Sequence, residues 1–276
     1  MPFPVYFYLG PLRLHPHFVL EALAYGVGLY FVLFRRLANS NPSSADSTRL
    51  SGEVIDSQLA ISPSQRSSIS VGALVGALLG AKLLVMAQHI NLLGEDWRMF
   101  ALLVLQGKTI VGALLGGLIG VEMTKKMIGV RQSTGDGFVW SVMVGMMIGR
   151  VGCFLTGLSD RTYGIATTLP WGVDFGDGIT RHPTQLYEVG FLLLLIIFLR
   201  WMVSRQLSAQ KLREGDLFKL FMIAYLAFRF AVDFIKPEFR PLFGMSAIQC
   251  ACVGGLAYYC KDIYRLSRLT GHWNVS

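Results

Sequence analysis

Apolar residues along this 276-residue chain gather into long stretches that short polar segments separate. A helix that crosses a membrane needs about 20 consecutive, mainly apolar residues, and several of the stretches approach that length. A further apolar run, 99–105, is too short to cross and is expected to form an interfacial or re-entrant arm. The pattern therefore predicts an all-α, polytopic membrane protein with seven transmembrane helices, over residues 18–34, 69–87, 109–123, 138–158, 184–203, 216–235 and 245–260.

The composition excludes most classes of soluble protein. Hydrophobic residues make up 53% of the chain and charged residues 15%, and the mean hydropathy is +0.50. A soluble domain carries about 25% charged residues. A disordered chain, a nucleic-acid-binding module and most soluble enzymes are therefore excluded, and residues 1–276 are expected to form a single transmembrane domain.

Lys and Arg are distributed unequally between the two sides of the predicted membrane. Fourteen of them lie in segments 35–70, 124–137 and 200–215 or after residue 260, and seven lie on the other side. Because cytoplasmic segments carry the excess of positive charge, the N-terminus is expected outside and the C-terminus in the cytoplasm. The Ser-rich segment 38–68 is then expected to be a mobile cytoplasmic loop, and segment 159–183 a loop on the outer face.

Two arginines fall inside predicted spans, where a charge at mid-bilayer costs about 2.5–3.5 kcal/mol. They are Arg150 in the fourth helix and Arg229 in the sixth. On a helix Tyr225, Arg229 and Asp233 share one face, because they are spaced i, i+4 and i+8. Either Asp233 merely neutralises Arg229, or the set forms an anion site facing a polar cavity, with Asp233 orienting the guanidinium.

Two sets of polar side chains mark the predicted outer ends of the first and fifth helices. His17, Glu21 and Tyr25 are spaced so that they share a helix face, and so are Gln185 and Glu188, whereas His182 suits the cap of the fifth helix. Each set either forms a polar stripe or bridge between helices, or it contacts a ligand. The first set is His17, Glu21 and Tyr25, and the second, in the segment RHPTQLYE, is His182, Gln185 and Glu188.

Neither a metal nor a cofactor is expected from the spacing of ligand-type residues. Cys153 follows Arg150 by three residues in an apolar segment, and it is expected to be a buried structural cysteine. Asp174 and Asp177 resemble a metal-ligand pair only weakly, and turn formation in FGDG explains them better. No disulfide framework is implied, because every cysteine lies in an apolar stretch: Cys153, Cys250, Cys252 and Cys260.

Glycines recur every four residues in the second and third predicted helices. Small residues at this spacing let helix backbones approach closely in lipid, so the pattern predicts helix packing. Lys82 lies near the end of the second helix and is expected to extend to the membrane surface. The repeats are Gly72, Gly76 and Gly80, and then Gly112, Gly116 and Gly120.

Several motifs occur together and in one order along the chain: GGLIGV, GRVGCF, YG followed by LPWGV, RHPTQLYE, FRFAVDF, KPE and GMSAIQ. In this order and spacing the chain resembles the phosphatidylglycerol–prolipoprotein diacylglyceryl transferase family. The resemblance implies a protein of the bacterial inner membrane with seven spans, so that segment 159–183 is periplasmic. It also implies transfer of a diacylglyceryl group from phosphatidylglycerol to the lipobox cysteine of a prolipoprotein, with formation of a thioether and release of glycerol phosphate.

The resemblance assigns roles to the polar residues described above. Arg150 and Arg229 match the family's two functional arginines, which would hold the phosphate. Tyr225 and Asp233 match the family's Tyr and Glu beside the second arginine, so these four are the expected catalytic residues. The expected substrate-binding residues are His17, Glu21, Tyr25, His182, Gln185 and Glu188.

The chain departs from the family pattern around the acceptor thiol. Leu115 replaces the family's His before Gly-Gly, so its general base is missing; Cys153 replaces Asn in Gly-Asn-Phe, and Thr156-Gly157-Leu158 replaces Asn-Gly-Glu. The family's Gly-Gly-Arg resembles Gly80-Ala81-Lys82. An alternative function is therefore a non-catalytic paralogue that binds or transports anionic phospholipid. For an active enzyme, the groups that could replace the base are His17, Glu21, Asp160 and His182.

Overall fold

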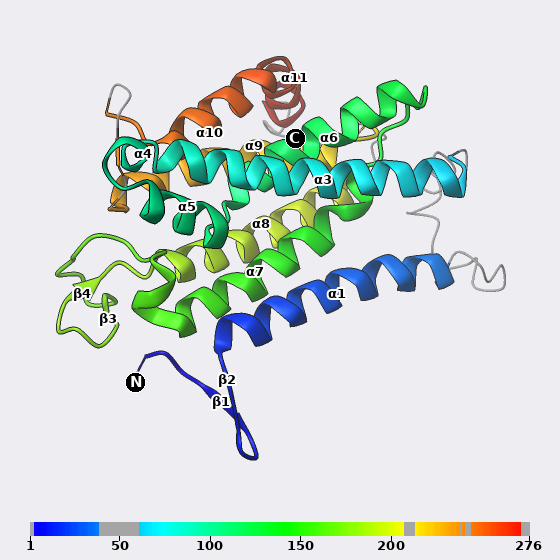
Figure 1. Ribbon diagram of the computed structural model, residues 1–276. Coiled ribbons are helices and arrows are strands. Elements are labelled where there is room, and N and C mark those ends of the chain that lie inside the picture. The colour runs from blue at the N-terminus through cyan, green and yellow to red at the C-terminus, as the bar shows by residue number, and fades with distance from the viewer. Residues whose placement is uncertain (1–2, 39–60, 207–212, 238, 241–243, 272–276) are drawn as a thin grey trace. The chain divides into compact units, whose positions relative to one another are not determined.

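The computed structural model describes residues 3–38, 61–206, 213–237, 239–240 and 244–271, which are mainly helical (Figure 1). Every apolar stretch predicted as a span coincides with a helix, so the all-α class is confirmed. Most of the predicted loop 38–68 lies outside the described residues. The helices are α1 (Pro16–Ala38), α3 (Pro63–Gln88), α4 (Leu92–Glu95), α5 (Trp97–Gln106), α6 (Ile110–Met127), α7 (Val139–Thr156), α8 (Thr184–Gln206), α9 (Asp216–Val232), α10 (Ala247–Tyr258) and α11 (Cys260–Gly271), with 3₁₀ turns η2 (Asp136–Phe138), η3 (Gly157–Asp160) and η4 (Asp233–Ile235).

The chain divides into two compact units, which are described separately. Unit 1 contains the hairpin of β1 (Phe7–Leu9) and β2 (Leu12–Leu14), helices α1, α7 and α8, and the hairpin of β3 (Val173–Asp174) and β4 (Thr180–Arg181). Unit 2 contains α3 to α6, α10 and α11. Helix α9 contributes its first residues, up to Phe221, to unit 1 and the rest to unit 2.

Unit 1 is built on α7, which packs against both α1 and α8 (Figure 1). The approach of α1 depends on Gly152, where an added Cβ would lie 3.1 Å from the Cβ of Leu20 and 3.6 Å from the Cα of His17. Buried apolar side chains fill the contact with α8, including Met143 and Leu192, which are both 0% exposed. This packing fixes the residues of α1, α7 and α8 that face one another.

The β3–β4 hairpin is a short antiparallel pair within segment 159–183, with Val173 opposite Arg181 and Asp174 opposite Thr180. Its turn is held by Asp174, whose Oδ1 accepts hydrogen bonds from the backbone N–H groups of Gly176, Asp177 and Gly178 at 2.8–3.1 Å. The interpretation of FGDG as a turn is therefore confirmed. The Asp177 carboxylate accepts two hydrogen bonds from Arg181, both 2.7 Å, and these bonds lower the pKa of Asp177.

Unit 2 is built on the antiparallel pair α3 and α6, whose glycines face one another. A Cβ added at Gly76 would lie 2.3 Å from the carbonyl oxygen of Gly116, and one added at Gly116 would lie 2.2 Å from that of Gly76. The same reciprocal contact joins Gly72 to Gly120 and Gly80 to Gly112. The glycine repeats therefore bring two backbones into direct contact, as small residues do between helices in lipid.

Helices α5 and α6 meet at an angle of 68°, which makes them a broken span or a re-entrant arm. The side chain of Lys82 stabilises the chain where α5 ends. Its Nζ donates hydrogen bonds to the carbonyl oxygens of Val104, Leu105 and Gly107 at 2.8, 2.7 and 2.9 Å. The last carbonyls of a helix lack intrahelical donors, and the dipole there attracts a cation. Lys82 therefore binds the end of helix α5.

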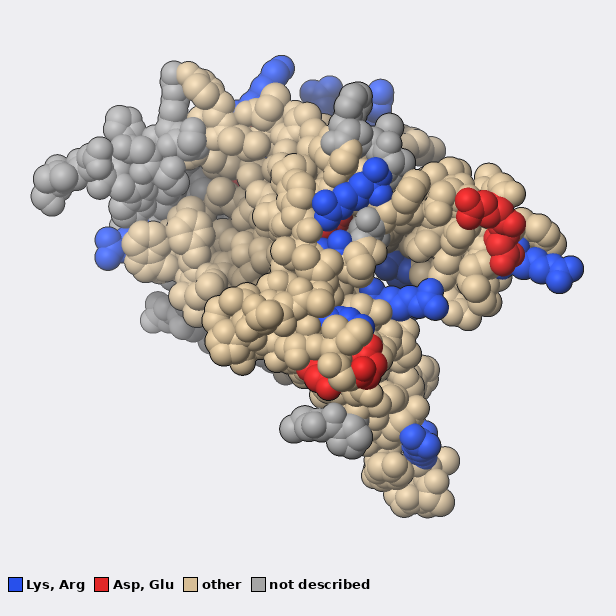
Figure 2. Space-filling view, turned by 90° about the vertical axis from the view of Figure 1, so that its left-hand side faces the viewer, with Lys and Arg blue, Asp and Glu red and all other residues tan. Residues whose placement is uncertain are grey.

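Among the described residues, three helical segments are long and apolar enough to cross a membrane, namely 63–88, 136–160 and 184–205, and the bent pair α5–α6 would be a fourth. Their outer faces are apolar: Leu78 is 59% exposed and Leu194 is 68% exposed. On the face shown in Figure 2, charged side chains form small separate groups and other residues make up most of the surface. These features are those of a membrane protein.

Candidate functional site

A buried ion pair joins α7 to α8 in unit 1. Arg150 on α7 places its Nε 2.9 Å from Oε1 of Glu188 on α8, and the two side chains are 9% and 1% exposed. In surroundings of low dielectric constant such a close ion pair interacts strongly, and its two partners are costly to separate. The sequence suggested both residues as site residues, but it did not indicate that they form a pair.

Gln185 lies one turn before Glu188 on α8 and is 1% exposed. Within the described residues, neither Oε1 nor Nε2 of its amide has a hydrogen-bond partner. Buried side-chain amides are normally paired, and leaving one unpaired costs about 1–3 kcal/mol. A buried, unsatisfied amide beside an arginine–carboxylate pair is the arrangement expected where a polar ligand group binds.

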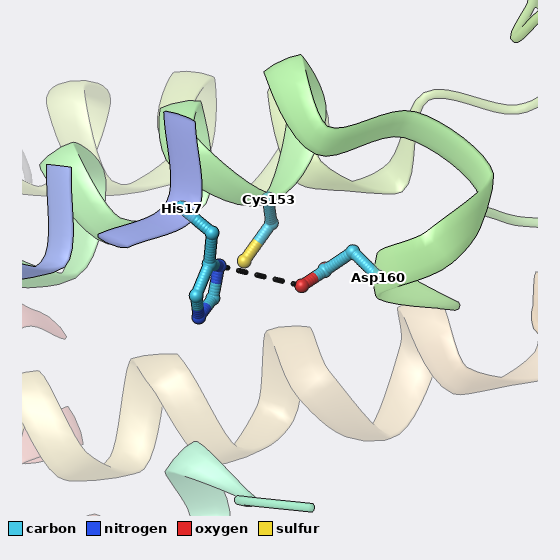
Figure 3. Close-up of side chains that lie close together, drawn as sticks. All are labelled: His17, Cys153 and Asp160. Carbon is cyan, nitrogen blue, oxygen red and sulfur yellow. Dashed lines mark ion pairs between the residues drawn. The ribbon is translucent and has the colours of Figure 1, made fainter. Parts of the chain in front are cut away.

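The polar stripe on α1 forms a chain of contacts that leads to the end of α7. Tyr25 donates a hydrogen bond from its hydroxyl to Oε1 of Glu21 at 2.8 Å, and Oε2 of Glu21 lies 3.5 Å from Nε2 of His17. The other ring nitrogen of His17, Nδ1, lies 3.4 Å from Oδ1 of Asp160 in η3 (Figure 3). The thiol of Cys153 lies in the same cluster. The structure thus brings three expected site residues together with Asp160.

His182 belongs to a different network of unit 1, on the segment that precedes α8. Its Nδ1 lies 3.0 Å from the hydroxyl oxygen of Tyr187, and Trp171 donates a hydrogen bond from Nε1 to the same oxygen at 2.9 Å. His182 therefore contacts Tyr187 of α8, and Tyr187 is in turn bound by Trp171 of segment 159–183. The sequence pattern placed it correctly before the fifth helix, but gave no sign of Tyr187.

Unit 2 contains a second buried arginine–carboxylate pair. Nη2 of Arg229 lies 3.8 Å from Oδ1 of Asp233, and the side chains are 3% and 0% exposed. Helix α9 ends at Val232, so Asp233 is the first residue of the 3₁₀ turn η4. At 3.8 Å these two atoms form an ion pair without a direct hydrogen bond. Tyr225, one turn before Arg229, is 0% exposed.

The carboxylate of Asp233 has a second partner that sequence reasoning missed. Its Oδ2 accepts a hydrogen bond from the hydroxyl of Ser246, the N-cap of α10. Ser246 and Gln249 form a capping box: the Ser246 hydroxyl accepts from the backbone N–H of Gln249 at 3.1 Å, and the side-chain Oε1 of Gln249 accepts from the backbone N–H of Ser246 at 2.9 Å. Asp233 therefore joins the end of α9 to the start of α10. The motif GMSAIQ, singled out earlier, was the available signal.

Leu115 of α6 faces α10. A Cβ added at Gly255 would lie 3.0 Å from Cδ2 of Leu115 and 2.7 Å from Cδ1 of Leu226. Gly116 faces α3, as described above. Gly117 does so too, because an added Cβ there would lie 3.5 Å from the carbonyl oxygen of Ala73. The space that accommodates the Leu115 side chain therefore comes from Gly255, across the helix interface, and not from the neighbouring glycines of α6.

Fold and site together define a helical membrane protein that holds a buried arginine–carboxylate pair in each of its two units. The family model described as prolipoprotein diacylglyceryl transferase matches residues 4–260. The chain belongs to this family.

Similar proteins from three bacteria carry the name phosphatidylglycerol–prolipoprotein diacylglyceryl transferase. The protein of Campylobacter lari is 31% identical over 64% of this chain and 67% of its own length. Those of Methylococcus capsulatus and Nitratidesulfovibrio vulgaris are 30% and 29% identical, each over 84% of this chain and 81% of their own length. No solved structure matches this chain.

Proposed function

We propose that this protein transfers a diacylglyceryl group from phosphatidylglycerol to the cysteine thiol of a prolipoprotein lipobox. The family match over residues 4–260 carries the proposal. In the reaction the thiol sulfur forms a bond to the terminal carbon of the diacylglyceryl group. The bond from that carbon to the phosphate oxygen breaks, glycerol phosphate leaves with the electron pair, and the thiol proton must be removed.

The donor phosphate binds at Arg150. The support is the buried pair with Glu188, which holds the guanidinium in an apolar region, and the unsatisfied amide of Gln185 one turn away. A phosphate or glycerol oxygen can accept from Nε2 of Gln185, and a glycerol hydroxyl can donate to its Oε1. Arg150 stabilises the negative charge that grows on the leaving phosphate, and such an interaction is stronger away from water.

Arg229 has the same class of role, as a cation for phosphate, with Tyr225 and Asp233 as the residues that hold it. The support is their match to the family's functional positions and the burial of all three side chains. The tie from Asp233 to Ser246 means that the carboxylate positions the arginine from a fixed helix start. The proton of the acceptor thiol is removed in unit 1, where the contacts of His17, Glu21 and Asp160 converge.

The membrane arrangement is part of the proposal. The chain has seven spans in the bacterial inner membrane, with the N-terminus outside, segment 38–68 in the cytoplasm and segment 159–183 in the periplasm. The unequal distribution of Lys and Arg supports this orientation. It puts the β3–β4 hairpin on the side from which a lipobox cysteine arrives.

The test is incubation of the purified protein with labelled phosphatidylglycerol and a lipobox peptide, followed by the glycerol phosphate released and the thioether formed. Arg150→Lys keeps the charge but cannot form the two-pronged bond of a guanidinium. It should lower turnover at least about tenfold, the equivalent of roughly 1.5 kcal/mol for one charged hydrogen bond. The matched control is Arg200→Lys, an exposed arginine on α8, which should leave turnover unchanged.

One observation favours the alternative of a lipid-binding paralogue without catalysis: Leu115, which the resemblance matches to the family's base, lies beside Gly255, where an added Cβ would also meet the apolar side chain of Leu226. Binding of phosphatidylglycerol that Arg150→Lys weakens, with no product from the wild-type protein, would establish this alternative. Neither binding nor product would defeat both functions. Equal turnover by the wild-type, Arg150→Lys and Arg150→Ala proteins would remove Arg150 from the site.

A further inference from the structure

Three side chains with metal-binding atoms converge in unit 1, although they lie far apart in the sequence. They are His17 near the start of α1, Cys153 on α7 and Asp160 at the end of η3 (Figure 3). One ligand atom from each lies within 4.8 Å of those of the other two. The thiol is 9% exposed, whereas the carboxylate and imidazole side chains are 12% and 37% exposed, so the cluster is open on one side.

The separation of the nitrogen and oxygen atoms is that of two ligands on one ion. Nδ1 of His17 and Oδ1 of Asp160 are 3.4 Å apart, which exceeds the 2.7–3.2 Å of an N–H···O hydrogen bond. Within the described residues, Nδ1 makes no hydrogen bond although the atom is buried. Zn–N and Zn–O bonds of about 2.0–2.2 Å at a tetrahedral angle would put the two atoms about 3.4 Å apart.

The surrounding contacts are those that orient metal ligands. A metal-bound histidine normally donates its other ring N–H to a carboxylate, and Nε2 of His17 lies 3.5 Å from Oε2 of Glu21. The second oxygen of Asp160 accepts a hydrogen bond from the hydroxyl of Thr162 at 2.5 Å. Nη1 of Arg150 lies 4.0 Å from Sγ of Cys153 and donates a hydrogen bond to the sulfur.

Local backbone features bring the three residues together. Gly152, the residue before Cys153, lets α1 approach α7 at His17. Helix α7 then ends at Thr156, and Gly157, with φ +71°, turns the chain into η3 so that Asp160 comes back beside the thiol. Glycine is suited to this position because a side chain is strained at positive φ.

A cysteine–histidine–aspartate nucleophile triad is the other chemistry that this set could serve. In a triad, the thiol and the carboxylate bind opposite nitrogens of the imidazole. Here the carboxylate of Asp160 faces Nδ1, the thiol lies on the same side of the ring, and Nε2 points away from both (Figure 3). Because Nε2 has Glu21 as its partner, no ring nitrogen is placed for a triad, whereas convergence on Nδ1 suits an ion.

We propose that His17, Cys153 and Asp160 bind a zinc ion with an open fourth position that accepts the thiol of the acceptor cysteine. Thiolate, imidazole and carboxylate are all zinc ligands, and three protein ligands with an open position are typical of catalytic zinc sites. An acceptor thiol that binds the ion loses its proton, since a coordinating thiol is deprotonated. The binding of the acceptor thiol at the open position rests on the proposed function. The ion would hold the acceptor thiolate near Arg150, whose Nη1 lies 4.0 Å from Sγ of Cys153.

The metal site is tested by binding alone, on the full-length, tag-free protein in detergent. After removal of metal with a chelator, the protein is titrated with Zn²⁺ and separately with Co²⁺. One ion should bind each chain, and the cobalt form should show the near-ultraviolet charge-transfer band of a thiolate ligand. Cys153→Ser and the family residue, Cys153→Asn, should each abolish the band. Glu21→Gln should weaken zinc affinity about 10–100-fold, as loss of a ligand's orienting partner does.

Matched controls are Cys260→Ser and His89→Ala, a cysteine and a histidine elsewhere in the chain, which should bind as the wild-type protein does. A folded wild-type protein with less than one tenth of an equivalent of zinc, or an unchanged cobalt band in both Cys153 variants, would overturn the site. If both Cys153 variants fail to fold, Asp160→Asn is the deciding variant. The loss of a zinc ligand must lower the affinity for zinc, so an unchanged affinity in Asp160→Asn would overturn the site.

The binding of the acceptor thiol to the ion is tested separately. A lipobox peptide should intensify the charge-transfer band of the cobalt protein, and its Cys→Ser analogue should not. An unchanged band with the peptide would overturn the acceptor role. Lipid transfer by a protein that stays metal-free throughout would also overturn the acceptor role of the ion, but it would leave the proposed transferase function intact.

Discussion

Glu188→Gln tests whether the Arg150 pair is a closed structural bridge or a site that a phosphate completes. The change keeps the shape of the side chain and removes the negative charge 2.9 Å from the guanidinium. Both side chains are more than nine-tenths buried, so the remaining charge loses a counter-ion where water cannot replace it. Removing one partner of a buried pair costs about 3–5 kcal/mol.

The loss is measurable as a fall in Tm. In a chain of 150–250 residues, each kcal/mol moves Tm by about 2–4 °C, so Glu188→Gln should lower Tm by roughly 10 °C in detergent with phosphatidylcholine. Phosphatidylglycerol should restore part of this loss, because a ligand at about 100 times its Kd stabilises a protein by about 2.7 kcal/mol. The difference in Tm between the two lipids should therefore be larger for Glu188→Gln than for the wild-type protein.

The control is Glu95→Gln, at an exposed position on α4, which should not change Tm with either lipid. Exposed substitutions usually stay within about 0.5 kcal/mol. A Glu188→Gln protein as stable as the wild-type protein in phosphatidylcholine would refute the energetic argument. Equal rescue by both lipids would refute the assignment of Arg150 to a phosphate.

Two further predictions concern orientation and the second arginine. In a protein without native cysteines, Asp177→Cys should react with an impermeant thiol reagent applied outside intact cells, and Arg131→Cys should react only after permeabilisation; the reverse pattern would overturn the orientation. Ser246→Ala removes both a helix cap and the bond to Asp233, so it should lower stability by about 1–2 kcal/mol more than Ser62→Ala, which removes only the cap of α3. Equal losses of Tm would mean that the Asp233 bond contributes nothing.

Patterns along the chain were sufficient for features that depend on neighbours in sequence. Apolar stretches located the helices, and the i, i+4 spacing of Glu21 and Tyr25 anticipated their hydrogen bond. The spacing of Gly76 and the other glycines anticipated a close helix contact, although not which helix would be the partner. In each case the rule is geometric: residues one helical turn apart share a face.

The pairings between helices could not be derived in this way. Arg150 and Glu188 are on different helices, and nothing in either segment specifies that α7 and α8 lie side by side. Cys153 was expected to be buried, and it is 9% exposed, but its place beside His17 and Asp160 could not be derived, because the cluster draws on three elements. The apolar run 99–105 indicated a separate arm before the third helix, but nothing in the sequence indicated that Lys82 would bind the carbonyl oxygens at the end of that arm.

Leu115→His tests what replaces the family's missing base. The new ring would lie against Gly255 and Leu226, in a space bounded by the helix interface. General-base assistance is worth about 10²–10⁴-fold, so even a poorly placed imidazole would be detectable if the wild-type protein lacked a way to activate the thiol. Because His17, Glu21 and Asp160 converge elsewhere, in unit 1, we expect measurable wild-type transfer to a lipobox peptide and no increase from Leu115→His.

The apolar control is Leu115→Met, which keeps the packing against α10. Leu115→His should be less stable than this control by about 1–3 kcal/mol, the cost of a buried polar group without a partner. If the activity of Leu115→His rises by two orders of magnitude, the protein has lost thiol activation and kept the lipid site, and unit 1 does not supply the missing step. If it does not rise, Glu21→Gln and His182→Ala measured in parallel separate the two remaining polar networks. Only the first should reduce transfer, because Glu21 contacts the ring of His17, whereas His182 has its contact with Tyr187.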